Sequence, residues 1–158
     1  MEKSYFPMFV DISEKKIVVV GGGRIAARRV DTLTYFAGNI TVIAPEVTRQ
    51  LLELNEDGRI YCMIREYEKG DIAGADMVLA ATDDRQLNHS IADECRVLER
   101  EKGRRILFNT ADDKDLCDFY FPSVITRDDI VIGINSGGRN PGKVKQVREK
   151  LKEKLDIL

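Results

Sequence analysis

Three consecutive glycines separate an apolar run from a helical pattern in the segment 17–30, IVVVGGGRIAARRV. A short β-branched run of this kind predicts a buried strand. The glycines allow a sharp turn that brings backbone N–H groups close to a ligand, and the following helix directs the positive end of its dipole to the same point. Gly21, Gly23 and Ala26 match the G-x-G-x-x-G/A pattern. The segment therefore predicts a binding site for a nucleotide pyrophosphate.

One feature of the usual dinucleotide pattern is missing. An acidic residue normally follows the second strand, where it binds the ribose hydroxyls. Here the predicted second strand ends in Ala44 and is followed by Pro45 and Glu46. Because Glu46 lies one residue beyond the proline, its reach to the ribose stays open. The choice between NAD and NADP stays open with it.

Apolar strand patterns and helical patterns alternate along the first two thirds of the chain. The predicted strands are residues 17–20, 40–44, 59–65, 76–81 and 105–109, and the predicted helices are about 24–37, 46–56 and 85–102, the last with a buried stripe at Leu87, Ile91, Cys95 and Leu98. Such alternation favours parallel strands joined by right-handed crossovers. We therefore expect an α/β fold, a Rossmann-like parallel sheet with helices on both faces, over residues 1–112.

The pattern changes after Thr110. Extended apolar runs at 118–126 and 130–135 flank a short polar turn, which predicts a β-hairpin. Because an isolated two-stranded ribbon is marginal in water, this hairpin has to pack on the body or pair with a second copy in a symmetric dimer. From Pro141 a C-terminal amphipathic helix is expected to bury Val144, Val147, Leu151 and Leu155. Residues 113–158 thus form a second expected region, a dimerisation arm and helix.

The composition is typical of a globular protein. The chain has 158 residues, 43% hydrophobic and 33% charged, with no apolar run long enough to span a bilayer and no signal-peptide pattern. Its three scattered cysteines predict reduced thiols in a cytoplasmic protein. The segment 139–158 carries seven basic and three acidic residues, whereas the rest carries 18 and 24. This basic tail has no accompanying DNA-recognition motif, so a nucleic-acid partner is not favoured.

Two strand ends carry polar residues that could take part in chemistry. Thr82 and Asp83 follow the fourth strand, where ligands of open parallel sheets bind, although Thr82, Asp83 or Asp84 could instead cap the next helix. Asn109, Asp112 and Asp113 follow the fifth strand, where a carboxylate could act as a general base or simply be solvated. Both interpretations of Thr82 and Asp83 stay open, whereas solvation is the favoured interpretation of each aspartate after the fifth strand when its chemistry alone is considered.

Other constellations are less informative. His89, the single histidine, falls on a helix flank, and with no cysteine cluster it predicts no metal site. A hydrolase triad is not favoured because no G-x-S-x-G elbow is present. The run Ser136, Gly137, Gly138 and Arg139 fits either an anion-binding turn or a hinge.

Taken in order, five motifs resemble the precorrin-2 dehydrogenase family, which includes the dehydrogenase/ferrochelatase part of siroheme synthase. They are FPMF at 6–9, VVVGGGRIAARRV at 18–30, AATDDRQLN at 80–88, FNTADDKDLCDFYFPS at 108–123 and GINSGGRNP at 133–141. The resemblance implies oxidation of precorrin-2 to sirohydrochlorin with NAD as hydride acceptor, in a homodimer. It also implies a polyanionic tetrapyrrole substrate and no membrane partner.

The resemblance also implies roles for particular residues. By its spacing to residues 119–123, Asp112 rather than Asp113 matches the catalytic aspartate of the family. The cofactor contacts map onto Gly21, Gly22, Gly23, Arg24, Ile25, Pro45, Glu46, Thr82 and Asp83. The substrate contacts map onto Asn109, Ser136, Gly137, Gly138 and Arg139.

Longer members of the family continue past the last helix into a helical region or a methyltransferase domain, whereas this sequence ends at Leu158. The expectation that follows is a truncated member, in which chelatase activity is open and a partner could supply the missing region. The alternative function is an NAD-sensing or tetrapyrrole-binding module without turnover.

Overall fold

The computed structural model describes residues 4–157, which divide into two compact units. The larger unit comprises residues 11–119, and the smaller one combines residues 4–10 with residues 120–157. The expected boundary after Asp112 falls in the loop that follows the last strand of the larger unit. The division into two domains stays a prediction, and each compact unit is described by itself.

The larger unit is built on a five-stranded parallel sheet in the order β3-β2-β1-β4-β5. Its strands are β1 (Lys16–Val20), β2 (Asn39–Ala44), β3 (Tyr61–Ile64), β4 (Met77–Ala80) and β5 (Leu107–Thr110). The order reverses direction between β1 and β4, because the chain returns from the edge strand β3 to the other side of β1. This is the switch point at which ligands of such sheets bind.

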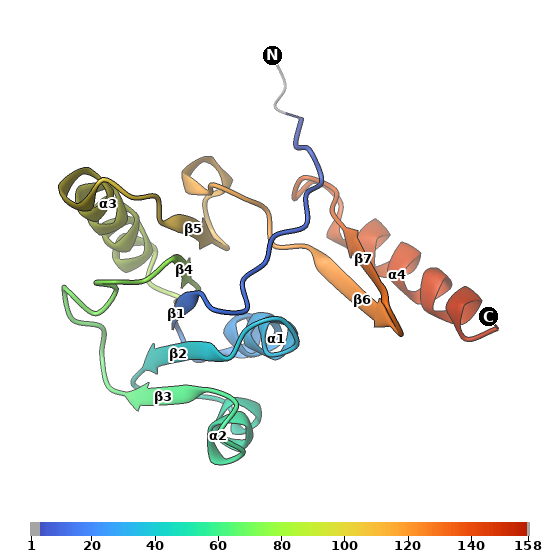
Figure 1. Ribbon diagram of the computed structural model, residues 1–158, viewed down its shortest axis with the longest axis horizontal. Coiled ribbons are helices and arrows are strands. Elements are labelled where there is room, and N and C mark those ends of the chain that lie inside the picture. The colour runs from blue at the N-terminus through green and yellow to red at the C-terminus, as the bar shows by residue number, and fades with distance from the viewer. Residues whose placement is uncertain (1–3, 158) are drawn as a thin grey trace. The chain divides into compact units, whose positions relative to one another are not determined.

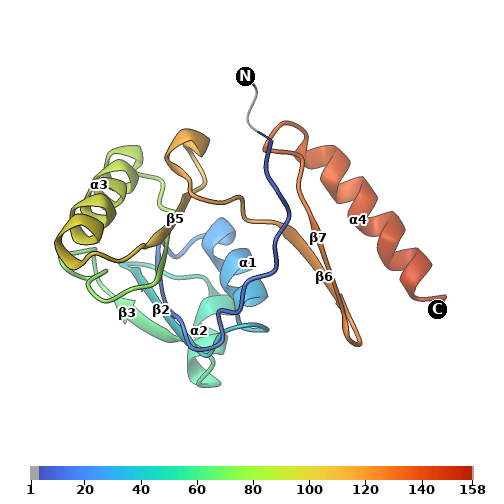
Figure 2. The same ribbon diagram turned by 45° about the horizontal axis from the view of Figure 1, so that its top comes forward.

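Three helices cover the two faces of this sheet. Figures 1 and 2 show α1 (Arg24–Leu33) and α2 (Arg49–Glu56) on one face and α3 (Arg85–Lys102) on the other. Because both faces are covered, all of residues 17–20 in the central strand are buried, and they are all β-branched. Side chains that alternate along β1 point to opposite faces, so Val18 and Val20 join the core beneath α3 with Ile91, Cys95 and Phe108. The expected Rossmann-like α/β fold is confirmed.

Two helix ends differ from the prediction for local reasons. Helix α2 begins at Arg49 instead of Glu46, because the Thr48 side chain accepts a hydrogen bond from the Leu51 N–H and caps the helix there. Residues 45–48 instead fold against the glycine turn, where the Thr48 N–H donates to the Gly22 carbonyl at 2.9 Å. Helix α1 ends at Leu33 in a further turn, and Ala37 is buried beyond it.

The smaller unit contains a hairpin and a helix. Strands β6 (Ser123–Arg127) and β7 (Ile130–Ile134) are antiparallel, with Arg127 opposite Ile130, so the turn is only Asp128 and Asp129. Asp128 adopts φ 51°, a left-handed conformation that aspartate tolerates in hairpin turns. The expected hairpin is confirmed, but its first strand begins five residues later than predicted. Asp118 is instead bonded back to β5, where its N–H donates to the Phe108 carbonyl.

Helix α4 (Pro141–Leu155) follows the hairpin in the smaller unit. Its first turn is capped by Asn140, whose side chain accepts from the Lys143 N–H, and Pro141 stands at the first helical position. The predicted burial of its apolar stripe is wrong, because Val144, Leu151 and Leu155 are half-buried and Val147 is 37% exposed. The helix packs against β6, where Arg148 donates to the Ser123 hydroxyl and the Val124 carbonyl. None of the helices within residues 4–157 combines the length and the apolar character that a membrane span requires.

Candidate functional site

The candidate site lies at the carboxyl edge of the parallel sheet. Because β1, β2, β4 and β5 are parallel, the loops that follow them emerge at the same edge. These loops are the glycine turn at 21–23, the segment 45–48, the turn at 82–84 and the loop at 111–113. The larger unit therefore brings together all predicted cofactor residues and Asp112.

Backbone atoms of the segments that follow β2 and β4 pack tightly against the first two glycines of the turn. Gly21 has φ 124°, which side chains rarely adopt, and a Cβ there would overlap the Ala81 carbonyl at the end of β4. A Cβ on Gly22 would overlap the Glu46 carbonyl and crowd Val47. The Gly21 N–H donates to the Ile43 carbonyl oxygen at 2.9 Å, which links the turn to β2. The first two glycines are therefore required for folding of this turn.

Gly23 differs from the first two glycines, because the space that its Cβ would occupy is free of other described atoms. A Cβ there would meet no atom of the described chain within 4 Å, and Gly23 is the N-cap of α1. Within residues 4–157 no side chain caps this helix, and its first turn holds no acidic residue. An open, uncapped helix start with its positive dipole end exposed binds anions. This cradle fits a dinucleotide pyrophosphate.

The other predicted cofactor residues border this cradle. Arg24 and Ile25 are the first two residues of α1, and both are exposed, Ile25 to 44%. Pro45 and Glu46 are also exposed, directly after β2 and against Gly22. An exposed isoleucine side chain beside a phosphate cradle can cover an apolar part of a ligand. Whether these residues contact the cofactor stays a prediction.

The turn after β4 is stabilised by hydrogen bonds to residues of α3. Asp84 rather than Thr82 or Asp83 caps α3, since its carboxylate accepts from the Leu87 N–H at 3.1 Å. The Thr82 hydroxyl donates to Asn88 Oδ1 at 2.6 Å, which uses its single proton inside the protein. Asp83 is exposed at the tip of the turn.

Asp112 is exposed at the end of β5, and its two carboxylate oxygens have different partners. Oδ1 accepts from the Thr110 hydroxyl at 2.8 Å, and Oδ2 accepts from Asn88 Nδ2 at 3.0 Å. Partial burial raises the pKa of Asp112, but these two hydrogen bonds and the charges of Arg85 and His89 outweigh it and lower the pKa below its ordinary value. Asp112 is therefore an anion at neutral pH.

Asn88 is a site residue that the sequence prediction missed. The predicted stripe of α3 was Leu87, Ile91, Cys95 and Leu98, but the buried residues are Asn88, Ile91, Ala92 and Cys95. Leu87 is only half-buried, so the stripe is centred one position later than predicted. Spacings of three, four and seven residues place Asn88 in line with Ile91, Ala92 and Cys95, and this was the signal that could have found it.

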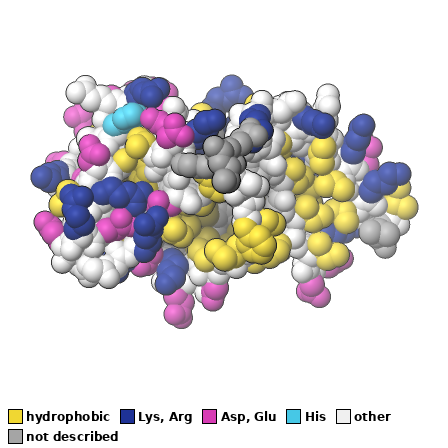
Figure 3. Space-filling model, turned by 90° about the horizontal axis from the view of Figure 1, so that it is seen from above, with side chains coloured by type: hydrophobic (Ala, Val, Ile, Leu, Met, Phe, Trp, Pro, Cys, Tyr) yellow, Lys and Arg dark blue, Asp and Glu magenta, His cyan; other side chains and the backbone are white. Residues whose placement is uncertain are grey.

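His89 lies on the flank of α3, as expected. Its Nε2 atom is 3.3 Å from Asp113 Oδ2, and Arg85 Nη2 approaches the same oxygen at 3.4 Å. Figure 3 shows the histidine side chain in contact with acidic side chains. The Nε2 atom is buried but has no partner with hydrogen-bond geometry among the described residues, so His89 and Asp113 lie close together without a hydrogen bond.

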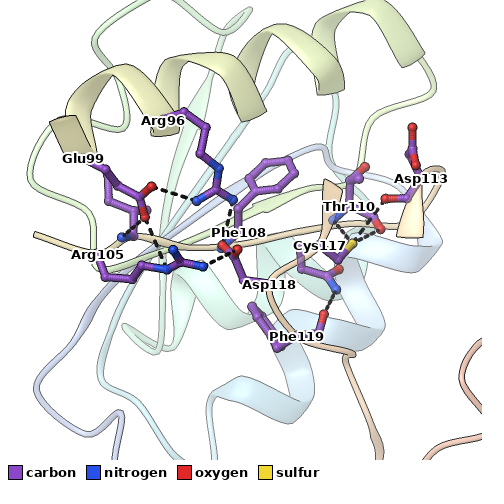
Figure 4. Close-up of polar contacts among 11 residues, drawn as sticks. Arg96, Glu99, Arg105, Phe108, Thr110, Asp113, Cys117, Asp118 and Phe119 are labelled. Atoms are coloured by element: carbon purple, nitrogen blue, oxygen red, sulfur yellow. Dashed lines mark hydrogen bonds and ion pairs between the residues drawn. The ribbon is translucent and has the colours of Figure 1, made fainter. Parts of the chain in front are cut away.

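The loop that carries Asp112 is fastened to α3 by a network of charged groups (Figure 4). Asp118 accepts from Arg96 through Oδ2 and from Arg105 through Oδ1, both at 2.8 Å. Glu99 accepts from Arg96 and from the Ile106 N–H, also at 2.8 Å. Burial raises the pKa of Glu99, but these partners outweigh it and lower the pKa overall.

A thiol and an amide fix the two ends of the same loop. The Cys117 Sγ donates to the Thr110 carbonyl at 3.2 Å, and burial raises the pKa of this thiol, so it is protonated at neutral pH. Asn109 is buried, with its Nδ2 donating to the Phe119 carbonyl at 2.8 Å and its Oδ1 accepting from Arg29. Asn109 thus faces α1 and ties β5 to the loop end, while its predicted substrate contact stays a prediction.

The remaining predicted substrate residues belong to the smaller unit. Gly137 and Gly138 have φ values of 67° and 74°, so the chain reverses sharply before α4. The Ser136 Oγ accepts from the Asn140 N–H at 3.1 Å, and the Arg139 N–H donates to the Ser136 carbonyl at 3.3 Å. These bonds make a compact turn of residues 136–140.

Comparison with known proteins gives relatives for both sequence and fold. A family model described as "Putative NAD(P)-binding" matches residues 8–123. "Siroheme synthase" from Psychrobacter sp. (strain PRwf-1) is 36% identical over 146 residues, covering 92% of this chain and 29% of the relative. "Siroheme synthase" from Pseudoalteromonas atlantica is 38% identical over 147 residues, covering 93% of this chain and 30% of the relative. The chain therefore spans less than a third of the length of these two relatives.

A solved structure of "SirC, precorrin-2 dehydrogenase" superposes with a TM-score of 0.79. The match covers 95% of this chain and 70% of that chain, at 23% sequence identity. This likeness shows that the two chains share a fold that includes both compact units.

Proposed function

The chain belongs to this NAD(P)-binding family, and we propose that it is a precorrin-2 dehydrogenase that oxidises precorrin-2 to sirohydrochlorin with NAD. The names of its siroheme synthase relatives and of the structural neighbour support this assignment. The observation that carries it is the placement of the Asp112 carboxylate, an anion fixed by Asn88 and Thr110, at the same sheet edge as the open start of α1.

The chain's own groups would hold the dinucleotide at that edge. Backbone N–H groups of the glycine turn and of Arg24 and Ile25 would bind the pyrophosphate, and Pro45 with Glu46 would line the adenosine end. Thr82 and Asp83 would border the other half of the cofactor at the end of β4. Bound NAD supplies an acceptor for a hydride.

Asp112 has a defined task in this oxidation. Converting precorrin-2 to sirohydrochlorin removes one hydride and one proton from the tetrapyrrole. Loss of the hydride leaves positive charge on the rings, which a nearby carboxylate anion stabilises. A cationic ring N–H is acidic, so even a weakly basic carboxylate accepts its proton. Because Asp112 is exposed, it returns that proton to water.

The smaller unit would supply substrate contacts and a dimer interface. Ser136, Gly137, Gly138 and Arg139 form a tight turn that carries a cation, which suits the carboxylates of a tetrapyrrole. The half-buried stripe of α4 and Ile130 of the hairpin, 52% exposed, are apolar surfaces that a second copy would cover. We place this homodimer in the cytoplasm, since all three cysteines are free thiols.

The test is to incubate the purified chain with precorrin-2 and either NAD, NADP or no nucleotide, and to follow the absorbance of sirohydrochlorin. The proposal expects oxidation with NAD and none without nucleotide. Tight NAD binding without oxidation would overturn it in favour of a binding module. Sedimentation of the same sample tests the dimer, and a sedimenting monomer at assay concentration would contradict that part.

A further inference from the structure

The Asn88 side chain joins two loops that come from different strands. Its Nδ2 donates to the Thr82 carbonyl at 3.0 Å and to Asp112 Oδ2 at 3.0 Å. Its Oδ1 accepts from the Thr82 hydroxyl at 2.6 Å and from the Thr82 N–H at 3.3 Å. One side chain on α3 thus connects the end of β4 to the end of β5.

The orientation of this amide is fixed by its partners. An asparagine offers two N–H donors and an acceptor oxygen with two lone pairs, and all four are used here. Turning the amide over would point Oδ1 at the Asp112 carboxylate and at the Thr82 carbonyl, two acceptors that it cannot satisfy. Asn88 is 1% exposed, so water cannot replace a lost partner. The Asn88 amide is therefore held with an N–H group, and not its oxygen, directed at Asp112.

We propose that Asn88 is a positioning residue, which holds Asp112 as an anion at a fixed place relative to the Thr82 turn. The proposal rests on the proposed dehydrogenase, in which the carboxylate and the cofactor meet at this edge. A hydrogen bond given to a carboxylate favours its charged form and fixes its rotamer. Asn88 does this from a buried position, whereas Thr110 donates from the same strand as Asp112.

Other charged groups also act on Asp112 and have to be kept constant in a test. Arg85 and His89 face it from α3 and favour its anion. Asp113 follows it in the loop and lies against those same two side chains. An uncharged variant at position 88 leaves these groups in place and adds no charge, so a changed titration of Asp112 reports the lost amide.

The experiment uses two variants and a matched control. Asn88→Asp keeps the size and the acceptor but replaces the donor with an acidic group. Asn88→Ser adds no charge and withdraws the donor, because its hydroxyl takes the place of the amide carbon and falls short of Asp112. Asn55→Asp is the control, because Asn55 accepts a hydrogen bond from the Cys62 N–H between α2 and β3 and an aspartate can still do so. Carbon-13 NMR of the ligand-free protein gives the Asp112 titration, with Asp112→Asn to assign its signal.

We expect the Asp112 titration to move up by about one pH unit or more in Asn88→Asp, less in Asn88→Ser, and not at all in Asn55→Asp. With precorrin-2 and NAD, kcat at neutral pH should fall about tenfold in Asn88→Asp, and its acid limb should move up with the titration. An unchanged Asp112 titration in Asn88→Ser would overturn the proposal, because a shift in Asn88→Asp alone would come from the added charge. Because the NMR titration needs no turnover, failure of the wild-type oxidation assay would count against the proposed function alone.

Discussion

Phe108 and Asp118 are joined by two hydrogen bonds of 2.8 Å that run in opposite directions. The Phe108 N–H donates to Asp118 Oδ2, and the Asp118 N–H donates to the Phe108 carbonyl. This pair closes the loop of residues 109–117, which carries Asp112. The loop is therefore held at both ends by β5, and Asp118 is the residue on which its geometry depends.

The first prediction concerns the stability that Asp118 contributes. The Asp118→Ala variant leaves the Phe108 N–H unsatisfied and removes one of the two carboxylate partners of Arg96, whose side chain is only 31% exposed. We expect a loss of about 2–4 kcal/mol in the free energy of unfolding, measured by urea denaturation.

The control is an exposed ion pair in the smaller unit. Asp156 contacts Arg127 at 2.8 Å, but its side chain is 71% exposed. Asp156→Asn should therefore change the free energy of unfolding by no more than about 0.5 kcal/mol. Equal losses in Asp118→Ala and Asp156→Asn would show that the loop does not depend on Asp118.

The second prediction separates folding from binding within the glycine turn. Gly23→Ala adds a methyl group that meets no described atom, on the side where a pyrophosphate would approach. We expect this variant to fold and to bind NAD at least tenfold more weakly, as measured by calorimetry. Gly22→Ala should instead fail to fold or unfold at a much lower temperature, because its Cβ overlaps the Glu46 carbonyl.

Gly38→Ala is the matched control for Gly23→Ala. Gly38 is exposed before β2, its φ lies outside the left-handed region and a Cβ there meets no described atom. This variant should fold and bind NAD like the wild type. If Gly23→Ala binds NAD as tightly as Gly38→Ala, the open start of α1 is not the pyrophosphate site.

Much of this architecture could be predicted because its signals are contiguous in the sequence. The run at 17–20, the glycines and the start of α1 are neighbours, and the alternation of strands and helices predicts parallel strands joined by right-handed crossovers. The start of α2 was misplaced although Thr48 is a local capping signal, whose side chain accepts from the Leu51 N–H. The contact of residues 45–48 with Gly22 joins two separate segments, and a local pattern does not contain it.

The third prediction distinguishes Asp112 from Asp113. Asp112→Asn keeps the size and one acceptor but removes the anion, so the rate of precorrin-2 oxidation should fall by about two orders of magnitude or more. NAD affinity should stay within twofold. Asp113→Asn should retain most of the rate, because Asp113 mainly caps the short helix at Lys114–Leu116. Equal losses of rate in the two variants would contradict the assignment.

The fourth prediction concerns pH and Glu99. Because the pKa of Glu99 is lowered in the folded protein, its contribution to stability is present above its unfolded pKa and is lost as pH falls through its folded pKa. Glu99→Gln should therefore destabilise the protein at neutral pH, and its deficit should shrink below about pH 4. Urea unfolding of both proteins at neutral and acidic pH measures this. A deficit that does not change with pH would contradict the ionic role.

The site was harder to predict than the fold. Chain order alone places the loops after β1, β2, β4 and β5 at one edge, and so predicts which residues gather there. It does not predict their partners. Asn88 bonds Asp112 across 24 residues of sequence, and the Thr82 hydroxyl, which looked available to a ligand, is used by Asn88.

The proposed dehydrogenase activity is tested most directly by the ratio of NADH to sirohydrochlorin that forms when the chain is mixed with precorrin-2 and NAD. NADH and sirohydrochlorin are measured together as the reaction proceeds, for the wild type and for Asp112→Asn. If the hydride passes to NAD, the wild type forms one NADH for each sirohydrochlorin. Asp112→Asn should still bind NAD but form far less of both products. Sirohydrochlorin formed without NADH, or undiminished turnover by Asp112→Asn, would contradict the proposal.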